Sequence, residues 1–105
     1  MDKKQVVGIL NQFGKALEKR NVKAPQIILF GSHVNGTAHE DSDIDVVILS
    51  DSFEGKDYWE RIDVLAEAIA ELMQPIEAFA LTQQEWDSGE HMVSYYARDG
   101  ERISA

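Results

Sequence analysis

Two aspartates, Asp43 and Asp45, stand two residues apart where a run of β-branched residues begins. In a β-strand, residues i and i+2 leave the same face with Cα atoms about 6.5 to 7 Å apart, so both carboxylates can reach one ion. Two anions this close repel each other unless a cation or a proton lies between them. Because oxygen ligands favour hard cations, the pair predicts a site for magnesium, with manganese as the alternative ion.

A third carboxylate, Glu77, begins another strand-like run and shares a face of that run with Phe79 and Leu81. It would join Asp43 and Asp45 if the two strands are neighbours in the sheet. An exposed strand residue without a ligand fits the same pattern. Both roles for Glu77 are therefore open at this point.

Gly31 and Ser32 stand upstream, where an apolar run ends, and polar residues follow as far as Gly36 and beyond. Free amides at such a turn, a glycine that permits close approach and a serine hydroxyl together suit a phosphate group. The sequence thus places an anion site beside a cation site, as a metal-bridged triphosphate requires. Ser42, just before the aspartates, could contact the nucleotide or could bond the local backbone as a turn residue.

The elements that must position these residues follow from hydrophobic spacing. Val6, Leu10, Phe13 and Leu17 recur at helical steps and predict a helix from residue 3 to about residue 20. A second helix is predicted over residues 57–73, between a polar loop at 50–56 and Pro75. Its apolar positions are Ile62, Leu65, Ala66, Ile69, Leu72 and Met73.

Three short runs rich in β-branched and other apolar residues predict strands at 26–30, 44–49 and 75–81. Thr82 is a suitable cap for a short helix after the third strand. The tail, residues 91–105, is compatible with a short helix and a last extended piece at 102–103. The order helix, strand, strand, helix, strand, helix predicts an α+β, two-layer fold, with helices packed on one face of a small mixed β-sheet.

Composition narrows the classes of protein. A chain of 105 residues is expected to form a single domain over 1–105. The formal net charge of −9 would repel a phosphate backbone, so no direct nucleic-acid partner is expected. No apolar run approaches the roughly 18 residues of a membrane span, and the N-terminus shows no secretion signal, so no membrane partner is expected. With zero cysteines, a cytoplasmic protein is expected.

The aromatic residues Trp59, Trp86, Tyr95 and Tyr96 are expected either in the core or in contact with another chain. The core of so short a chain is small. Some of these side chains should therefore face a partner, either a different protein or a second copy in a homo-oligomer.

The site residues together carry a resemblance. Gly31-Ser32, three residues, Gly36, five residues and Ser42-Asp43-Ile44-Asp45 resemble the signature of the DNA polymerase β-like nucleotidyltransferase superfamily. Length and element order resemble its minimal nucleotidyltransferase (MNT) branch, often encoded beside a helical HEPN partner as toxin–antitoxin pairs. The resemblance implies the nucleotidyltransferase fold and the transfer of NMP, AMP from ATP above all, from an NTP to a hydroxyl, with release of pyrophosphate.

The resemblance also implies roles for individual residues. Asp43 and Asp45 would bind two Mg²⁺ ions, and Glu77 would bind the catalytic ion and help to activate the nucleophile. Gly31 and Ser32 would hold the β and γ phosphates. The implied acceptor is a tyrosine of a HEPN-type protein, which would make this chain an antitoxin.

Two positions depart from the family pattern. Arginines are common after the Gly-Ser pair, where this chain has His33 and Asn35, and the third carboxylate is usually an aspartate rather than Glu77. Two alternative functions therefore remain open beside AMP transfer to a protein partner. The chain could be an antitoxin that binds its partner through a weak or inactive site. It could also be a small-molecule nucleotidyltransferase of the aminoglycoside type, which would need an acceptor cleft.

Overall fold

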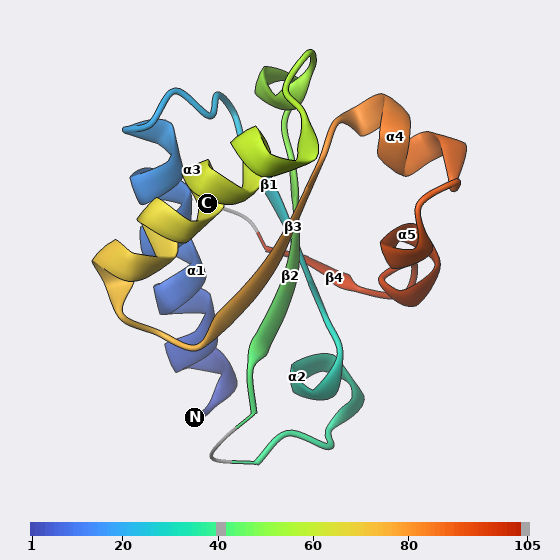
Figure 1. The fold of residues 1–105 in the computed structure, drawn as a ribbon. Coiled ribbons are helices and arrows are strands. Elements are labelled where there is room, and N and C mark those ends of the chain that lie inside the picture. The colour runs from blue at the N-terminus through green and yellow to red at the C-terminus, as the bar shows by residue number, and fades with distance from the viewer. Residues whose placement is uncertain (40–41, 104–105) are drawn as a thin grey trace.

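The structure, a computed structural model, describes residues 1–39 and 42–103 (Figure 1). Its centre is a four-stranded mixed sheet with the strand order β3-β2-β1-β4. β1 pairs antiparallel with both β2 and β4, whereas β2 and β3 run parallel. The strand bounds are β1 Gln26–Phe30, β2 Ile44–Leu49, β3 Ile76–Leu81 and β4 Glu101–Ile103.

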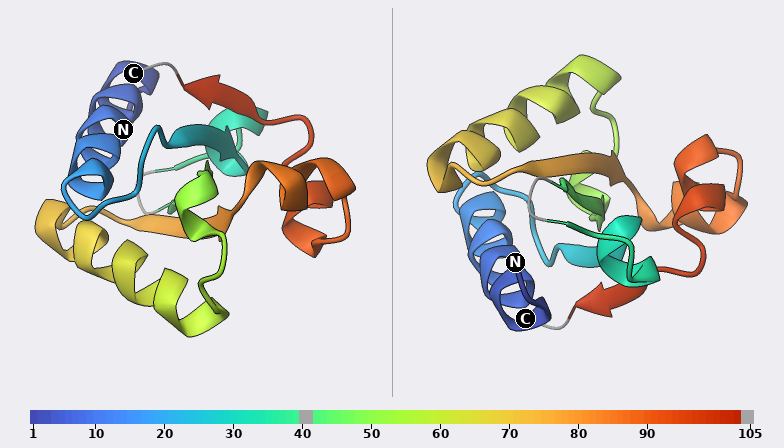
Figure 2. Two further views of the ribbon diagram at one scale, coloured as in Figure 1. Left: turned by 90° about the horizontal axis from the view of Figure 1, so that it is seen from above. Right: turned by 90° about the horizontal axis from the view of Figure 1, so that it is seen from below.

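The long helices α1 (Lys3–Glu18) and α3 (Tyr58–Leu72) pack side by side on one face of the sheet (Figures 1 and 2). The predicted α+β fold class is confirmed. The short helices α4 (Gln83–Ser88) and α5 (Met92–Tyr96) lie toward the opposite face, where they enclose a smaller apolar cluster. This second layer covers only one end of that face, so the other end is available for a site.

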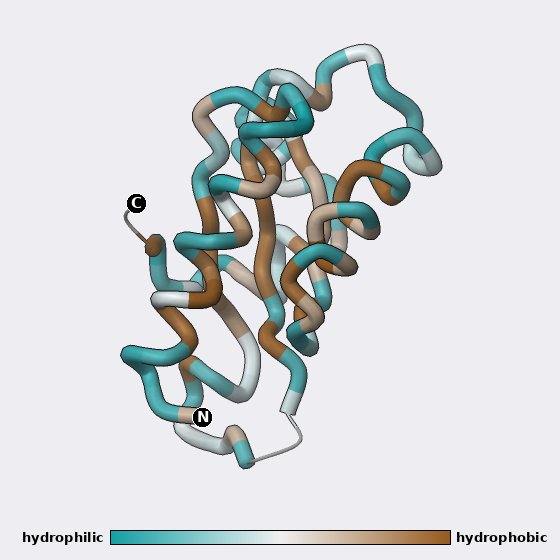
Figure 3. Tube along the Cα trace, turned by 90° about the vertical axis from the view of Figure 1, so that its left-hand side faces the viewer, coloured by the Kyte–Doolittle hydropathy of each residue, from teal (hydrophilic) through white to brown (hydrophobic). Residues whose placement is uncertain are grey.

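Apolar residues follow the strands and the inner sides of α1 and α3 (Figure 3). All four residues of the predicted stripe on α1 are fully buried: Val6, Leu10, Phe13 and Leu17. α1 begins at a capping box formed by Asp2 and Gln5, which satisfies the first free amides of the helix. The strands complete this core, because their residues alternate between the two faces of the sheet and every second one points into it.

The predicted apolar face of α3 needs two corrections. Ala66 is exposed because it lies about 100° around the helix from the buried Leu65. Met73 is 88% exposed because it ends the helix in a left-handed conformation that turns its side chain outward. Ala68, which is fully buried, takes the core position instead.

The polar loop and the tail also contain secondary structure that hydrophobic spacing did not predict in full. The loop holds a short 3₁₀ helix, Asp51–Phe53, whose Phe53 ring is fully buried. The tail supplies α5 and the edge strand β4. Of the four aromatic residues considered above, Trp86 packs against the smaller apolar cluster, whereas Trp59, Tyr95 and Tyr96 are exposed. None of the helices in residues 1–39 and 42–103 combines the length and apolar character needed to cross a membrane.

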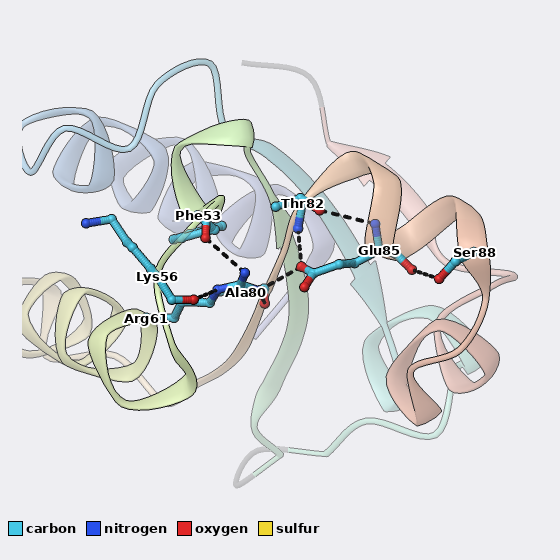
Figure 4. A network of polar contacts seen from close by, with 7 residues as sticks. All are labelled: Phe53, Lys56, Arg61, Ala80, Thr82, Glu85 and Ser88. Atoms are coloured by element: carbon cyan, nitrogen blue, oxygen red, sulfur yellow. Dashed lines mark hydrogen bonds and ion pairs between the residues drawn. The ribbon is translucent and has the colours of Figure 1, made fainter.

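Arg61 of α3 joins three segments by hydrogen bonds (Figure 4). Its guanidinium donates to the carbonyl oxygens of Phe53, Lys56 and Ala80 at 2.9, 3.1 and 3.2 Å. It also forms an ion pair with Glu85 of α4 at 2.7 Å. The side chain of Arg61 is only 14% exposed, so the loop, β3 and α4 are held together by a largely buried cation.

Replacing Arg61 with Met should lower the free energy of unfolding by about 3 kcal/mol, because it leaves buried carbonyls and Glu85 without a donor. Burial raises the pKa of Glu85, but hydrogen bonds from Arg61 and the Thr82 amide outweigh it and hold the pKa below its ordinary value. Urea denaturation measures the effect. In the matched control Arg98→Met, an exposed pair with Asp99 and a contact with the Tyr95 ring are lost, and the change should stay below about 1 kcal/mol. Equal effects of the two variants would refute the assigned role.

Candidate nucleotide and metal site

The three carboxylates lie near the amino-terminal ends of the parallel strands β2 and β3. Asp45 and Glu77 are register partners in the parallel pairing, so they occupy adjacent positions on the same sheet face. This is the face opposite α1 and α3, because the alternate residues Ile44 and Ile76 enter the main core. The strand adjacency on which the role of Glu77 depended is thus present.

Asp43 lies one residue before β2 rather than inside it, and its side chain is exposed. Its charge nevertheless acts on Asp45 and contributes to the raised pKa of that carboxyl group. Asp43 and Asp45 are therefore near enough to influence each other electrostatically, and a cation shared between them stays a prediction.

Gly31 brings the predicted phosphate-binding turn directly onto Asp45. Phe30, the last residue of β1, pairs with Asp45, and Gly31 follows with φ of 77°. A Cβ added at Gly31 would lie 2.4 Å from Oδ2 of Asp45, so only glycine fits at this position. The turn continues as a short helix, α2 (Ser32–Asn35), visible beside the lower end of β2 in Figure 1.

The other residues of the turn have the following places. Ser32 is the first residue of α2, and its carbonyl oxygen accepts from the amide of Gly36, which ends the helix with φ of 80°. Ser42 exchanges bonds with His39: its amide donates to the His39 carbonyl oxygen, and its hydroxyl accepts from the His39 amide, both at 3.0 Å. These bonds match the turn role of Ser42, and its contact with a nucleotide stays a prediction.

The surroundings of Asp45 disfavour the charged form of its carboxyl group. Burial is the largest cause that raises its pKa to about 6, followed by the charge of Glu77, a hydrogen bond between the two side chains and the charge of Asp43. His33 of α2 acts in the opposite direction. Asp45 and Glu77 can share a proton in this arrangement, and a divalent cation could replace that proton.

Asp45→Asn should remove a pH-dependent destabilisation. In divalent-free buffer, the contribution of Asp45 to the wild-type free energy of unfolding is expected to become less favourable as pH rises from about 4 to 6. Over this range the unfolded chain, with an Asp pKa of 3.8, releases its proton before the folded chain does, at about 6. Thermal melts from pH 4 to 7.5 should show the variant gaining on the wild type as pH rises. A difference in melting temperature between the two proteins that stays constant over that range would show that the folded protein does not raise the pKa of Asp45.

A metal ion needs a suitable set of donor atoms. In residues 1–39 and 42–103, no three His, Cys, Asp or Glu side chains are already grouped as metal ligands. Asp45 and Glu77 instead stand as register neighbours on the same sheet face, close enough for Glu77 to raise the pKa of Asp45. Carboxylate oxygens are nevertheless the donors that Mg²⁺ or Mn²⁺ prefers, and the mutual repulsion of Asp43, Asp45 and Glu77 favours a cation among them.

Two aromatic rings form a feature of this corner that the sequence did not indicate. The rings of Phe30 and Phe79 lie with centroids 6.2 Å apart, across the strand that carries Asp45. Phe30 precedes Gly31, and Phe79 follows Glu77 by two residues. The rings form an apolar surface next to the carboxylates. Only the pairing of the three strands brings these residues together, so sequence spacing alone carries no signal for it.

Comparison with known proteins identifies the family. The sequence model of the nucleotidyltransferase domain family matches residues 10–87, more than half of the chain, so the chain belongs to this family. The matched region includes all the site residues described above. Comparison with curated proteins gives no match.

Three solved structures are similar in fold. A candidate nucleotidyltransferase from Sulfolobus solfataricus has a TM-score of 0.71 and 14% identity, over 93% of this chain and 78% of that one. A second candidate nucleotidyltransferase has a TM-score of 0.64 and 28% identity, over 92% and 99%. The third, a toxin–antitoxin with AMP-PNP, has a TM-score of 0.62 and 23% identity, over 90% and 72%. These likenesses confirm the predicted nucleotidyltransferase fold.

Proposed function

We propose that residues 1–105 act as one magnesium-dependent nucleotidyltransferase domain in the cytoplasm. The domain moves AMP from ATP to a tyrosine of a HEPN-type partner and so acts as an antitoxin. The single observation that supports this most is the contact of Gly31 with the Asp45 carboxylate. The turn proposed to bind phosphate and the carboxylate proposed to bind metal would meet there, with Glu77 on the next strand. A toxin–antitoxin of similar fold, solved with AMP-PNP, agrees with an adenine nucleotide as substrate.

Each residue has a defined part in this proposal. Asp43 and Asp45 would hold both magnesium ions, and Glu77 would hold the ion nearest the acceptor. Bound magnesium would neutralise the phosphate oxygens and favour attack on the α-phosphate. Gly31 and Ser32 would orient the β and γ phosphates with backbone amides and a hydroxyl.

The reaction is an in-line displacement. The acceptor oxygen attacks the α-phosphorus, the bond from that phosphorus to the pyrophosphate oxygen breaks, and the acceptor proton passes to a carboxylate. Glu77 is exposed and lies on the side of Asp45 away from Gly31, so it is placed to receive that proton. In this proposal the parts of the reaction would follow the order of the strands: leaving group over β1, metal over β2 and acceptor at β3.

The test is incubation with ATP labelled in the α-phosphate, magnesium and the product of the neighbouring gene. Label should appear on a tyrosine of that protein, and the double variant Asp43→Asn, Asp45→Asn should transfer none. An unlabelled partner, alongside an active nucleotidyltransferase as positive control, would contradict the proposal.

A second candidate function is an antitoxin that neutralises its partner by contact alone. Exposed apolar side chains favour it, since Tyr58, Trp59 and Met92 are 65, 69 and 73% exposed and suit a protein interface. His33 and Asn35, which stand where arginines are usual, also favour it. In that case the double variant at Asp43 and Asp45 would still neutralise the partner, whereas the enzymatic function predicts loss of neutralisation.

A further inference from the structure

A cleft of about 320 Å³ lies along β3, between α3 on one side and the α4–α5 region on the other. In the described part of the chain, β3 is an edge strand of the sheet. The cleft is lined mainly by apolar side chains, with a few polar ones, as is usual for sites that bind organic groups. Its lining includes Tyr58 and Ile62 of α3, Phe79 and Leu81 of β3, and His91 and Val93 near α5.

The cleft borders the carboxylate corner at one residue. Phe79 lines the cleft, follows Glu77 by two residues and lies on the same sheet face. Its ring also meets that of Phe30, which precedes Gly31. Phe79 therefore links the cleft lining to the sheet face of Glu77 and to the ring beside the turn predicted to bind phosphate.

The chemistry of in-line displacement decides what the cleft can hold. The entering and leaving oxygens lie on opposite sides of the α-phosphorus. If Gly31 and Ser32, at the end of β1, hold the pyrophosphate, the acceptor must approach from the side of β3. The strand order β3-β2-β1 places the cleft on that side.

We propose that this cleft receives the acceptor, a tyrosine-bearing segment of a partner protein, and that Tyr58 and His91 position it. The inference rests on the proposed nucleotidyl transfer. The phenol oxygen would form the new bond to the α-phosphorus, pyrophosphate would leave, and the phenol proton would pass to Glu77. Apolar walls would hold the ring while its hydroxyl points toward the carboxylates.

The charges that line the cleft favour this acceptor over a small cationic one. The titratable groups that line the cleft are Lys56, Tyr58, Arg61, Glu85 and His91. Glu85 is paired with Arg61 at 2.7 Å, which leaves Lys56 as an excess positive charge. Among the described residues that line the cleft, no carboxylate is free to pair with the ammonium groups of an aminoglycoside, whereas the apolar walls suit the neutral ring of a tyrosine.

The surroundings of the cleft also suit a protein. Next to Tyr58, the ring of Trp59 packs edge-on at 5.0 Å, and both side chains are mostly exposed. On the other side, Met92, Tyr95 and Tyr96 of α5 are 73, 60 and 64% exposed. Exposed aromatic and methionine side chains on both sides of a cleft are typical of protein interfaces.

The test compares two cleft variants, Tyr58→Ala and His91→Trp, with Met73→Ala, which removes a large exposed apolar side chain outside the cleft lining. N-acetyltyrosinamide serves as the acceptor, with Mg·ATP as donor. Both cleft variants should raise the KM for the acceptor by about tenfold or more. The kcat and the Kd for a fluorescent ATP analogue should stay within about twofold of wild type. Met73→Ala should change none of these values.

Each other outcome is informative. A weakened Kd for the ATP analogue in the cleft variants, with an unchanged acceptor KM, would show that the cleft holds the nucleobase and would overturn the inference. Transfer to N-acetylserinamide but not to N-acetyltyrosinamide would overturn the acceptor class. Wild-type protein that binds the ATP analogue but transfers AMP to neither amide would contradict the inference and the proposed activity. Wild-type transfer with unaltered cleft variants would contradict the inference alone.

Discussion

Asp45→Asn is expected to lower the rate of nucleotidyl transfer by at least about a thousandfold while the fold stays intact. Asp45 is the central residue of the site: it pairs with Phe30 on one side and with Glu77 on the other, and Gly31 lies against its carboxylate. Asparagine keeps the shape but removes the charge that would hold both metal ions. Burial and the neighbouring carboxylates destabilise the charged form of Asp45. The variant should therefore be at least as stable as the wild type near neutral pH.

Single-turnover rates with saturating Mg·ATP measure this effect, and circular dichroism verifies the fold. Asp63→Asn is the matched control, because it removes one exposed carboxylate from α3, on the opposite face of the sheet, and should change the rate less than twofold. A loss smaller than about tenfold for Asp45→Asn would mean that Asp45 does not hold the catalytic ions.

Gly31→Ala should reduce nucleotide affinity and the rate of transfer by about a hundredfold. Its Cβ would stand 2.4 Å from Oδ2 of Asp45, far inside van der Waals contact, and its φ of 77° disfavours any side chain. Either the carboxylate or the turn must move. A shift of about 1 Å at a reacting centre is enough to cost about two orders of magnitude.

The control for backbone strain is Gly55→Ala. Gly55 has a φ of 78°, matching that of Gly31, but no heavy atom of the described residues lies within 4 Å of its added Cβ. Both variants should lose about 1 to 3 kcal/mol of stability from the positive φ, and Gly31→Ala should lose the more, because its ψ of −150° lies outside the left-handed helical region. Only Gly31→Ala should lose nucleotide affinity, as measured by titration of a fluorescent ATP analogue. A Gly31→Ala protein that binds the analogue normally would place the phosphate site elsewhere.

Local chemistry explains how much of this fold could be predicted. The strands β1 and β2 begin and end where they were expected, because short apolar runs are bounded by Pro25 and Gly31 in one case and by polar residues in the other. The order of elements predicted a mixed sheet, but whether the runs at 44–49 and 75–81 are neighbours was open until the structure showed their parallel pairing. The family signature supplied the roles that spacing alone could not assign.

Other features depend on packing and have no local signal. Gly31 looks like any turn glycine in the sequence, and only the antiparallel pairing of β1 with β2 brings it against Asp45. The raised pKa of Asp45 likewise requires the pairing with Glu77 and partial burial. The cleft along β3 combines side chains from α3, β3 and the tail, which no sequence interval could reveal.

The most direct test of the shared site is a crystal structure of the chain with Mn²⁺ and a non-hydrolysable ATP analogue, recorded with anomalous scattering from manganese. The account predicts manganese peaks within about 2.5 Å of carboxylate oxygens of Asp43 and Asp45, one of them also near Glu77. It further predicts the β and γ phosphates against the Gly31–Ser32 turn. A nucleotide bound elsewhere, or manganese away from these carboxylates, would contradict the account.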